Sequence, residues 1–278
     1  MTGVLYVVAT PIGNLDDISR RAIQVLAQVG RIAAEDTRHS ARLLQHLDIN
    51  TPLVAVHDHN EAGRVQGLIS QILAGENIAL ISDAGTPLIS DPGYRLVAAA
   101  HEANIQVIPI PGACAAIAAL SAAGLPSDRF TFEGFLSAKT TARQVQLQAL
   151  ANETRTLIFY EAPHRILECV QDMALIFGGE RRVVLAREIT KTFETIKQQT
   201  LTELSLWVEQ DSNQQRGEIV LVVEGAPVNS GQAAEAEVDA LLLKLLKYLP
   251  VKQSAQLASE LTGHKKNALY DRALLLQK

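Results

Sequence analysis

The sequence is poor in cysteine and in aromatic residues, and it has no long hydrophobic run. Its two cysteines, Cys114 and Cys169, lie far apart among 278 residues, which gives neither a disulfide framework nor a metal-binding spacing. The longest apolar stretches, such as residues 4–9 and 219–223, are far shorter than the roughly 20 residues of a transmembrane helix. The N-terminus lacks the basic segment of a signal peptide. We therefore expect a soluble, cytoplasmic protein with no membrane contact.

Several motifs that mark common enzyme classes are also missing. The sequence contains no GxGxxG, GxxxxGK[ST], GxSxG, HExxH or CxxC. A standard dinucleotide fold, a P-loop NTPase, an α/β-hydrolase, a zinc protease and a thiol redox enzyme each lose their main support. His57 and His59 could face the same side, but no third ligand is predictable, so we expect no metal site. The net charge of −5 argues against a general nucleic-acid coat protein but allows a local basic surface.

The most informative segment that is present is the loop at residues 81–93. It follows an apolar run at 77–81, which reads as a buried strand, and precedes an expected helix at 94–102. Open α/β sheets bind ligands at this edge of the sheet. Two prolines and two glycines stiffen the loop and let another molecule approach its backbone. A ligand-binding loop and a well-made turn are both consistent with this pattern.

The first half of the chain alternates short apolar strands with amphipathic helices. This rhythm predicts a largely parallel sheet with helices on both faces. The expected strands are residues 4–9, 32–34, 53–56, 77–81 and 105–110, and the expected helices are 18–29, 62–73, 94–102 and 113–123. The Pro111-Gly112 pair before the last helix and Gly124 after it follow the usual preference for early proline and late glycine.

The second half predicts another α/β domain, with a mixed sheet, and then a helical tail. Its expected strands are residues 130–136, 156–161, 182–189, 195–200 and 218–224, and its expected helices are 142–151, 165–177 and 201–209. A Gly/Pro/Ser/Asn linker at 225–232 precedes helices at 235–248, 251–261 and 265–276, of which the last two resemble a helix-turn-helix. We therefore predict domains at residues 1–112, 113–226 and 233–278. The tail from residue 251 has five Lys/Arg against two acids, which suits either nucleic-acid contact or a solvated helical cap.

Six segments at the ends of predicted strands carry a resemblance to a known family. They are residues 7–15, 34–38, 82–93, 109–116, 159–165 and 185–191. Together they resemble the tetrapyrrole methylase superfamily of S-adenosylmethionine (SAM) enzymes, and most closely a branch that methylates ribosomal RNA. The resemblance covers nearly the whole chain, including residues 265–270 of the tail. Thr86 and Cys114 stand where tetrapyrrole enzymes usually carry Asp and Ser, which favours the ribosomal branch over a corrin or porphyrin substrate.

The resemblance implies a fold, a cofactor and an activity. The fold class is α/β, with two domains of the tetrapyrrole methylase type (class III SAM methyltransferase) and a small C-terminal helical domain. The implied activity is SAM-dependent 2′-O-methylation of a cytidine ribose in the decoding region of 16S rRNA, within the 30S subunit. The implied assembly is a homodimer.

The resemblance also implies which residues bind SAM. They are Pro11, Ser82, Asp83, Ala84, Gly85, Thr86, Ala113, Cys114, Ala115 and Tyr160, together with the backbone near Ala186 and Arg187. The expected helix after Gly112 would offer free backbone N–H groups to a carboxylate, and the small side chains there allow close approach. Tight helix contact is the structural alternative for these small residues.

A second group of residues follows the strands as candidates for catalysis and RNA binding. Methyl transfer to a ribose hydroxyl needs alignment and removal of a proton. His59 is a candidate base, and Glu35 and Asp36 are comparable candidates if burial raises their basicity. The candidates for substrate contact are Arg38, Asn60, Arg165 and Lys191. Asp36 could instead be a helix N-cap, and the charged residues could form surface ion pairs.

Two other functions compete with RNA methylation. A methylase of a small tetrapyrrole would share the fold, although Thr86 and the basic tail argue against it. A non-catalytic RNA-binding or ribosome-assembly factor would bind RNA through the tail without SAM, and would tolerate Asp83→Ala and Pro11→Ala.

Overall fold

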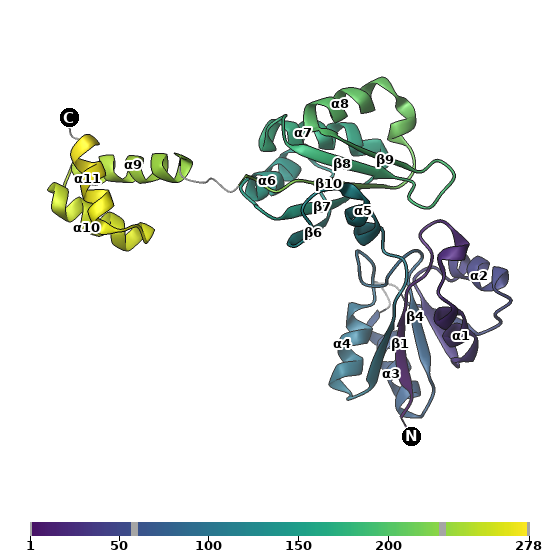
Figure 1. The fold of residues 1–278 in the computed structure, drawn as a ribbon. Coiled ribbons are helices and arrows are strands. Elements are labelled where there is room, and N and C mark those ends of the chain that lie inside the picture. The colour runs from purple at the N-terminus through teal and green to yellow at the C-terminus, as the bar shows by residue number, and fades with distance from the viewer. Residues whose placement is uncertain (1, 57–60, 228–231, 277–278) are drawn as a thin grey trace. The chain divides into compact units, whose positions relative to one another are not determined.

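The computed structural model describes residues 2–56, 61–227 and 232–276. Its chain divides into two compact units, residues 1–226 and 227–278. The first unit contains two five-stranded sheets with helices on both faces of each (Figure 1). The second is a group of three helices. The predicted boundary between residues 112 and 113 falls between the two sheets of the first unit, and it stays a prediction.

The first sheet is entirely parallel, as the alternation of strands and helices predicts. Its strands are β1 (Val4–Val8), β2 (Arg31–Ala34), β3 (Leu53–Ala55), β4 (Ile78–Ile81) and β5 (Gln106–Ile110). They lie in the order β3-β2-β4-β1-β5, with Leu5 opposite both Ile78 and Val107. All five carboxyl ends therefore meet at one edge of the sheet.

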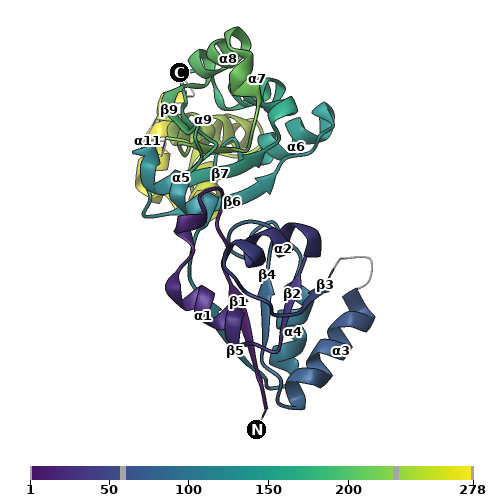
Figure 2. The ribbon, with the colours of Figure 1, turned by 90° about the vertical axis from the view of Figure 1, so that its right-hand side faces the viewer.

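Helices cover both faces of this sheet because its strand residues alternate between two cores. Leu5 and Ile78 belong to the core under α3 (Glu61–Leu73) and α4 (Tyr94–Glu102). Val8 and Ala79 belong to the core under α1 (Arg20–Gln28) and α2 (Thr37–His46). In Figures 1 and 2, β1 leads from the N-terminus toward the second sheet, so the loops after the strands lie at the inner end of this domain.

The second sheet is mixed, also as predicted. Its strands are β6 (Phe130–Phe135), β7 (Thr156–Glu161), β8 (Arg182–Arg187), β9 (Thr195–Thr200) and β10 (Ile219–Val223). The order is β6-β7-β10-β8-β9, and only β6 and β7 are parallel. One face packs against α5 (Ala115–Ala123), and the other packs against α6 (Thr140–Leu150), α7 (Ile166–Phe177) and α8 (Leu201–Gln210).

Several elements differ by a few residues at their ends from the prediction, and two of these differences, in β8 and α5, bear on the site. Strand β8 ends at Arg187 rather than at residue 189, because Glu188 and Thr190 adopt positive φ angles of 52° and 67°, which a strand cannot accommodate. Helix α5 begins at Ala115 rather than at residue 113, because Cys114 has an extended backbone. The described part of this unit also contains the 3-10 helices η1 (Leu15–Asp17), η2 (Pro163–Arg165) and η3 (Ser212–Gln215).

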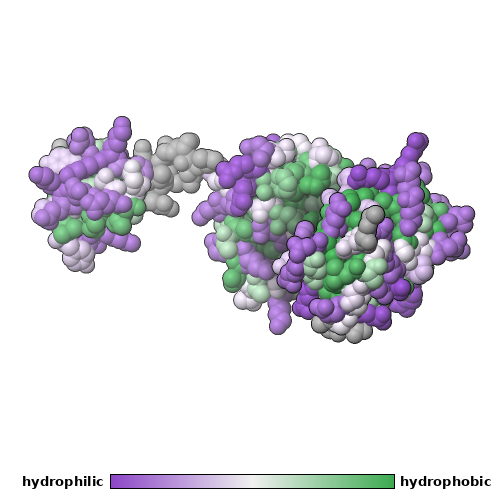
Figure 3. Space-filling view, turned by 90° about the horizontal axis from the view of Figure 1, so that it is seen from below, coloured by the Kyte–Doolittle hydropathy of each residue, from purple (hydrophilic) through white to green (hydrophobic). Residues whose placement is uncertain are grey.

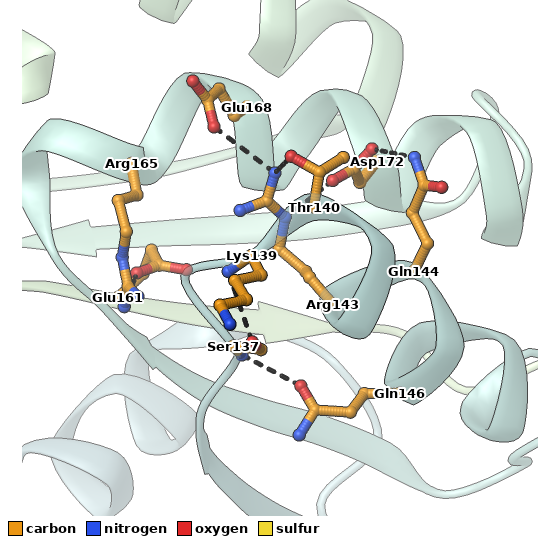
Figure 4. A network of polar contacts seen from close by, with 10 residues as sticks. All are labelled: Ser137, Lys139, Thr140, Arg143, Gln144, Gln146, Glu161, Arg165, Glu168 and Asp172. Carbon is orange, nitrogen blue, oxygen red and sulfur yellow. Dashed lines mark hydrogen bonds and ion pairs between the residues drawn. The ribbon is translucent and has the colours of Figure 1, made fainter.

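A buried ion pair joins α6 to α7 (Figure 4). The Arg143 side chain is 1% exposed, and its Nε donates to Asp172 Oδ2 at 2.6 Å. Gln144 donates to the other oxygen of Asp172 at 2.8 Å. Glu168 lies 3.4 Å from a second nitrogen of Arg143. Separating the two helices would leave a buried charge without its partner, which is energetically costly. The pair therefore holds α6 and α7 in one relative position.

The C-terminal unit contains α9 (Gln232–Leu246), α10 (Val251–Thr262) and α11 (Lys266–Leu276). Its small core includes Leu242, Ala258 and Leu269. Gly263, with a φ of 73°, ends α10 and opens the short turn to α11. Among the described residues, no helix is long and apolar enough to cross a membrane.

Candidate active site

A cavity of about 370 Å³ opens at the carboxyl edge of the first sheet, against the second sheet. This volume lies in the range of small-molecule and cofactor sites. Its described lining consists of Ile12, Ala84, Gly85, Thr86, Ile89, Ser90, Asp91, Cys114, Ala115, Phe135, Tyr160, Glu161, Ala162, Pro163, Ile189, Glu218, Ile219 and Val220. Figure 3 shows apolar residues gathered in the hollowed part of this unit. Six predicted cofactor-binding residues converge here: Ala84, Gly85, Thr86, Cys114, Ala115 and Tyr160.

The loop after β4 is fixed by hydrogen bonds to the loops after β1 and β5. The N–H of Thr10 donates to the Gly85 carbonyl at 2.8 Å, and the Gly85 N–H donates back at 3.1 Å. The Thr86 hydroxyl donates to the Ala113 carbonyl at 2.9 Å. Gly85 has a φ of 81°, and an added Cβ would lie 3.2 Å from Ile12. The sequence places glycine here because the loop needs both this conformation and this close approach.

Tyr160 forms part of the opposite wall, on β7. Its hydroxyl oxygen accepts the Ala116 N–H at 3.2 Å, in the first turn of α5. Its ring packs edge-on against Phe132 and Phe135, with centroid distances of 4.9 and 5.6 Å. Burial, with the neighbouring Cys114 and Asp91, raises the pKa of Tyr160 to about 12. The phenol is therefore protonated at neutral pH and has one hydrogen to donate.

Three carboxylates line the cavity, and two of them are ion-paired. Glu161 accepts from Arg165 at 2.6 Å and from the N–H of Ala162 at 2.7 Å. Glu218 lies 3.0 Å from the ammonium of Lys191, which also pairs with Glu188 at 2.9 Å. Figure 4 shows the Glu161–Arg165 pair near the end of β7. Arg165 and Lys191 therefore lie beside the cavity, as predicted substrate contacts would, but both are held by acids of this chain.

Asp91, the third carboxylate, is half-buried and differs from the other two. Burial raises its pKa, a hydrogen bond with the Ser82 hydroxyl lowers it, and the nearby charge of Asp83 raises it. The net direction is upward. No role is predicted for Asp91 from the sequence, although it lies in the loop at residues 81–93.

Asp36 and Arg38, which were predicted as site residues after β2, make contacts that stabilise the start of α2. Asp36 is the N-cap of α2, and its carboxylate accepts the Arg38 N–H at 2.8 Å. Hydrogen bonds from the Arg38 side chain and backbone lower the pKa of Asp36. The condition for a basic Asp36, a pKa raised by burial, is therefore not met. Asp83 joins this turn to the β4 loop, because its Oδ1 accepts the Asp36 N–H at 3.1 Å. Glu35 is half-buried at the end of β2.

Other predicted cofactor residues lie behind the cavity lining. Pro11 is buried directly before Ile12, and Ser82 is buried at the end of β4. Ala113 contributes the carbonyl that accepts from Thr86. Ala186 is buried beneath α5.

Arg187 has a structural set of contacts. Its guanidinium donates to Gln214 at 3.1 Å, to the Phe193 carbonyl at 3.2 Å and to Thr195 at 3.1 Å. These bonds tie the β8–β9 connection to η3. The Arg187 side chain is thus engaged within the second domain and is absent from the cavity lining.

Two predicted residues, His59 and Asn60, lie outside the described residues, as does the His57–His59 pair. Within the part of the chain that the structure describes, no group of three or more His, Cys, Asp or Glu residues could hold a metal ion. Phe135 and Glu218 line the cavity but gave no sequence signal, since they reach it only through the strand order of the second sheet. The segment at residues 159–165, which carries part of the family resemblance, contains Glu161, Ala162 and Pro163.

The two sheets, with a cavity at the parallel carboxyl edge, match a class of proteins that comparison with known families identifies. The sequence profile of Tetrapyrrole (Corrin/Porphyrin) Methylases matches residues 4–205, and that of the RsmI C-terminal HTH domain matches residues 232–277. Solved structures agree on the fold. A uroporphyrin-III-C-methyltransferase from Thermus thermophilus has a TM-score of 0.57 at 21% identity, covering 81% of this chain and 95% of its own. A diphthine synthase has a TM-score of 0.59 at 13% identity, covering 80% and 90%.

Closer relatives specify the branch. The ribosomal RNA small subunit methyltransferase I of Pseudomonas aeruginosa is 60% identical, over 99% of this chain and 98% of that protein. Its namesake from Haemophilus influenzae is 55% identical, over 97% and 96%. The chain belongs to the tetrapyrrole methylase family and, within it, to the ribosomal RNA small subunit methyltransferase I group. It is therefore a SAM-dependent methyltransferase, and the resemblance found in the sequence is confirmed.

Proposed function

We propose that this chain transfers a methyl group from SAM to the ribose 2′-oxygen of a cytidine in the decoding region of 16S rRNA. In this proposal it acts on the 30S subunit, in the cytoplasm, as a homodimer. The observation that carries the proposal is the convergence of six predicted cofactor residues on one cavity, in a chain whose relatives bear the name of a ribosomal RNA methyltransferase.

The residues of the cavity fit SAM. Ala84, Gly85, Cys114 and Ala115 have small side chains, which leaves room for a ligand beside the backbone. The Cys114 side chain does not cap α5, so the N–H groups of its first turn other than that of Ala116, which donates to Tyr160, suit a carboxylate. Aromatic and aliphatic side chains on the other wall suit a nucleoside base. When bound, SAM supplies the electrophilic methyl group.

The chain's own residues would hold and orient the reactants. Thr86 and Ser82 fix the β4 loop, and Pro11 and Asp83 fix the loops beside it. Tyr160 closes the other side of the cavity and can donate one hydrogen bond into it. Orientation of this kind can contribute several kcal/mol to methyl transfer, because the ribose oxygen must approach the methyl carbon in line.

RNA contact is proposed for exposed basic groups near the cavity and on the C-terminal helices. The Arg38 side chain is 90% exposed, which leaves it accessible to a phosphate even while it pairs with Asp36. Lys252 and Lys265 are exposed on the C-terminal unit, within the tail whose lysines and arginines outnumber its acids. Each of these side chains is accessible to a phosphate of an RNA backbone within its own unit.

A methyl-transfer assay tests the proposed function. Purified chain and tritiated SAM are given 30S subunits, naked 16S rRNA or a small tetrapyrrole, and labelled RNA is mapped by mass spectrometry. We expect label on one cytidine 2′-oxygen, with 30S subunits as the substrate. SAM binding without label on any RNA would contradict the proposal, and label on the tetrapyrrole would replace it.

A further inference from the structure

The cavity contains one carboxylate with no cationic partner among the described residues, and this is Asp91. It lies on the loop between β4 and α4, and it faces the same cavity as Tyr160 and Cys114. The other two carboxylates of the lining, Glu161 and Glu218, each accept from a cation at 3.0 Å or less. A carboxylate held by a cation is a poor proton acceptor, because ionisation is already stabilised. Asp91 is therefore the acid of the lining best suited to take up a proton.

The loop holds Asp91 in place through unusual backbone conformations. Leu88 and Ser90 have positive φ angles of 72° and 70°, which cost about 1–3 kcal/mol each in residues other than glycine. The Leu88 side chain packs against the core under α3 and α4, which anchors the loop. Gly93 has a φ of 119°, and an added Cβ would lie 2.9 Å from Leu80. Such strain persists only where the surroundings determine the conformation, and it gathers at functional sites.

The same loop reaches the second domain. Ser90 Oγ lies 3.6 Å from the point where a Cβ on Gly134 would sit, at the bulge of β6. The charge of Asp91 also contributes to the raised pKa of Tyr160, so the two groups interact across the cavity. Asp91 therefore belongs to the part of the first domain that meets the second-domain wall, where cofactor and ribose would have to come together.

We propose that Asp91 is the general base that accepts the proton of the ribose hydroxyl during methyl transfer, which rests on the function proposed above. A lone pair of the ribose oxygen forms the new O–CH₃ bond, the S–CH₃ bond breaks with its electron pair remaining on sulfur, and the hydroxyl proton passes to a carboxylate oxygen of Asp91. Tyr160, protonated at neutral pH, orients groups at the site and takes no part in that transfer.

The electrostatic surroundings of Asp91 suit this role. Burial and the charge of Asp83 raise its pKa, against the lowering effect of the hydrogen bond with the Ser82 hydroxyl, and a raised pKa makes the carboxylate a stronger proton acceptor than an exposed aspartate. The ionisable groups that face it are Asp83 on its own loop, Cys114 before α5, Tyr160 and Glu161 on β7, and Glu218 before β10. Of these, Asp83 is the acid whose charge acts on Asp91 directly.

The test compares Asp91→Asn with the wild-type chain, on 30S subunits under single-turnover conditions. Asparagine keeps the size of the side chain and an oxygen for the Ser82 hydroxyl. We expect the rate to fall by at least about 100-fold, as general-base catalysis contributes about 10²–10⁴-fold. We expect SAM affinity, measured by calorimetry, to stay within about threefold. Glu102→Gln, an exposed acid at the end of α4, is the matched control and keeps the wild-type rate.

The pH dependence separates a base from a structural residue. The wild-type rate should rise with pH on the acid side and level off above the pKa of Asp91. This rising part of the pH–rate profile, the acid limb, should be absent in Asp91→Asn. Asp83→Asn should move the limb to lower pH, because it removes a charge that raises the pKa of Asp91 and keeps the oxygen that accepts from Asp36. Asp91→Glu should restore part of the rate together with the limb.

A second readout needs no cofactor. The carboxyl ¹³C resonance of Asp91, identified by its loss in Asp91→Asn, should titrate above the ordinary aspartate range. If Asp91→Asn kept the wild-type rate and the wild-type rise of the rate with pH, Asp91 would not be the base, although the proposed function would stand. The same conclusion would follow if the loss of rate were explained entirely by weaker SAM binding. A wild-type chain that methylates no RNA would overturn the proposed function, and this role of Asp91 with it.

Discussion

The two walls of the cavity are built on different principles. The first-domain wall consists of loops, whose backbone is held in left-handed conformations at Gly85, Leu88 and Ser90. The second-domain wall is built mainly on strands β6, β7 and β10, and its acids Glu161 and Glu218 are held in ion pairs. In the first-domain wall (the loop wall), strained backbone conformations lower the stability of the fold while they place polar groups at the cavity. In the second-domain wall (the strand wall), the charged side chains already have partners within the chain. Substitutions in the strand domain should therefore change stability, and substitutions in the loops should change function.

The largest effect on stability is expected from Arg143→Ala, in the scaffold behind the strand wall. The variant leaves the Asp172 carboxylate, whose side chain is 10% exposed, without its buried cation. We expect a loss of about 3–5 kcal/mol in the free energy of unfolding. The measurement is urea unfolding followed by the fluorescence of Trp207, the single tryptophan, which packs on the core of this domain.

The control for Arg143→Ala is the double replacement Arg143→Met with Asp172→Leu. A hydrophobic pair of similar volume should restore most of the stability, because neither charge is then buried alone. The SAM affinity of the folded double variant should match the wild type. A single variant that loses less than about 1 kcal/mol would show that the pair contributes little to the scaffold.

The next effect is expected from Gly85→Ala, in the loop wall. Alanine at a φ of 81° is strained, and its Cβ would lie 3.2 Å from Ile12. We expect a loss of about 1–3 kcal/mol in stability and a fall of at least about tenfold in SAM affinity, as the loop shifts. Gly178→Ala is the matched control, because its φ is 93° and nothing lies within 4 Å of the added Cβ. If both variants bind SAM alike, the loop wall is not part of the cofactor site.

The sequence predicted the loop wall better than the strand wall, for a physical reason. The loops follow parallel strands, whose carboxyl ends share one edge, so local motifs such as Gly85-Thr86 already place their residues near a ligand. Phe135 and Glu218 come from β6 and from the approach to β10, and they meet only through the order of a mixed sheet. No local pattern specifies that order.

Arg187 shows how strand alternation decides the contacts of a side chain, while its predicted role in SAM binding, through the backbone, stays a prediction. Strand residues alternate between faces, and Ala186 belongs to the core under α5, whereas Leu185 belongs to the core under α6, α7 and α8. Arg187 therefore falls on the face away from α5, where it binds Gln214 and Thr195. Asp91 is the reverse case, because its position in a loop motif was visible but its half-buried setting beside Asp83 depends on the folded chain.

A smaller effect is expected from Tyr160→Phe, where the two walls meet. The variant keeps the ring contacts with Phe132 and Phe135 but leaves the Ala116 N–H without its acceptor. We expect a loss of about 1 kcal/mol in stability and a measurable fall in SAM affinity. Thr200→Ala removes the N-cap of α8 and is the matched control, with a similar loss of stability and unchanged SAM affinity. Equal affinities in both variants would limit Tyr160 to a structural role.

The smallest effect is a gain in stability from Asp91→Asn at neutral pH. The pKa of Asp91 is raised in the folded chain, so the folded state favours the protonated carboxyl. Its stabilising contribution is complete below the ordinary aspartate pKa and is lost as the pH rises through the higher folded value. Because water reaches and screens the half-buried group, the ionised carboxylate should destabilise the fold by less than about 1 kcal/mol.

Thermal unfolding at two pH values measures this gain. Asp91→Asn should melt a few degrees above the wild type at pH 7, since about 1 kcal/mol corresponds to roughly 2–4 °C in a domain of this size. The difference should vanish at a pH below the ordinary aspartate pKa, where both side chains are neutral. A variant that is less stable than the wild type at pH 7 would show that the carboxylate supports the loop, and the contrast between the two walls would fail at Asp91. We expect Asp91→Asn to be more stable than the wild type and inactive, because the loop wall gives up stability in order to place a catalytic group.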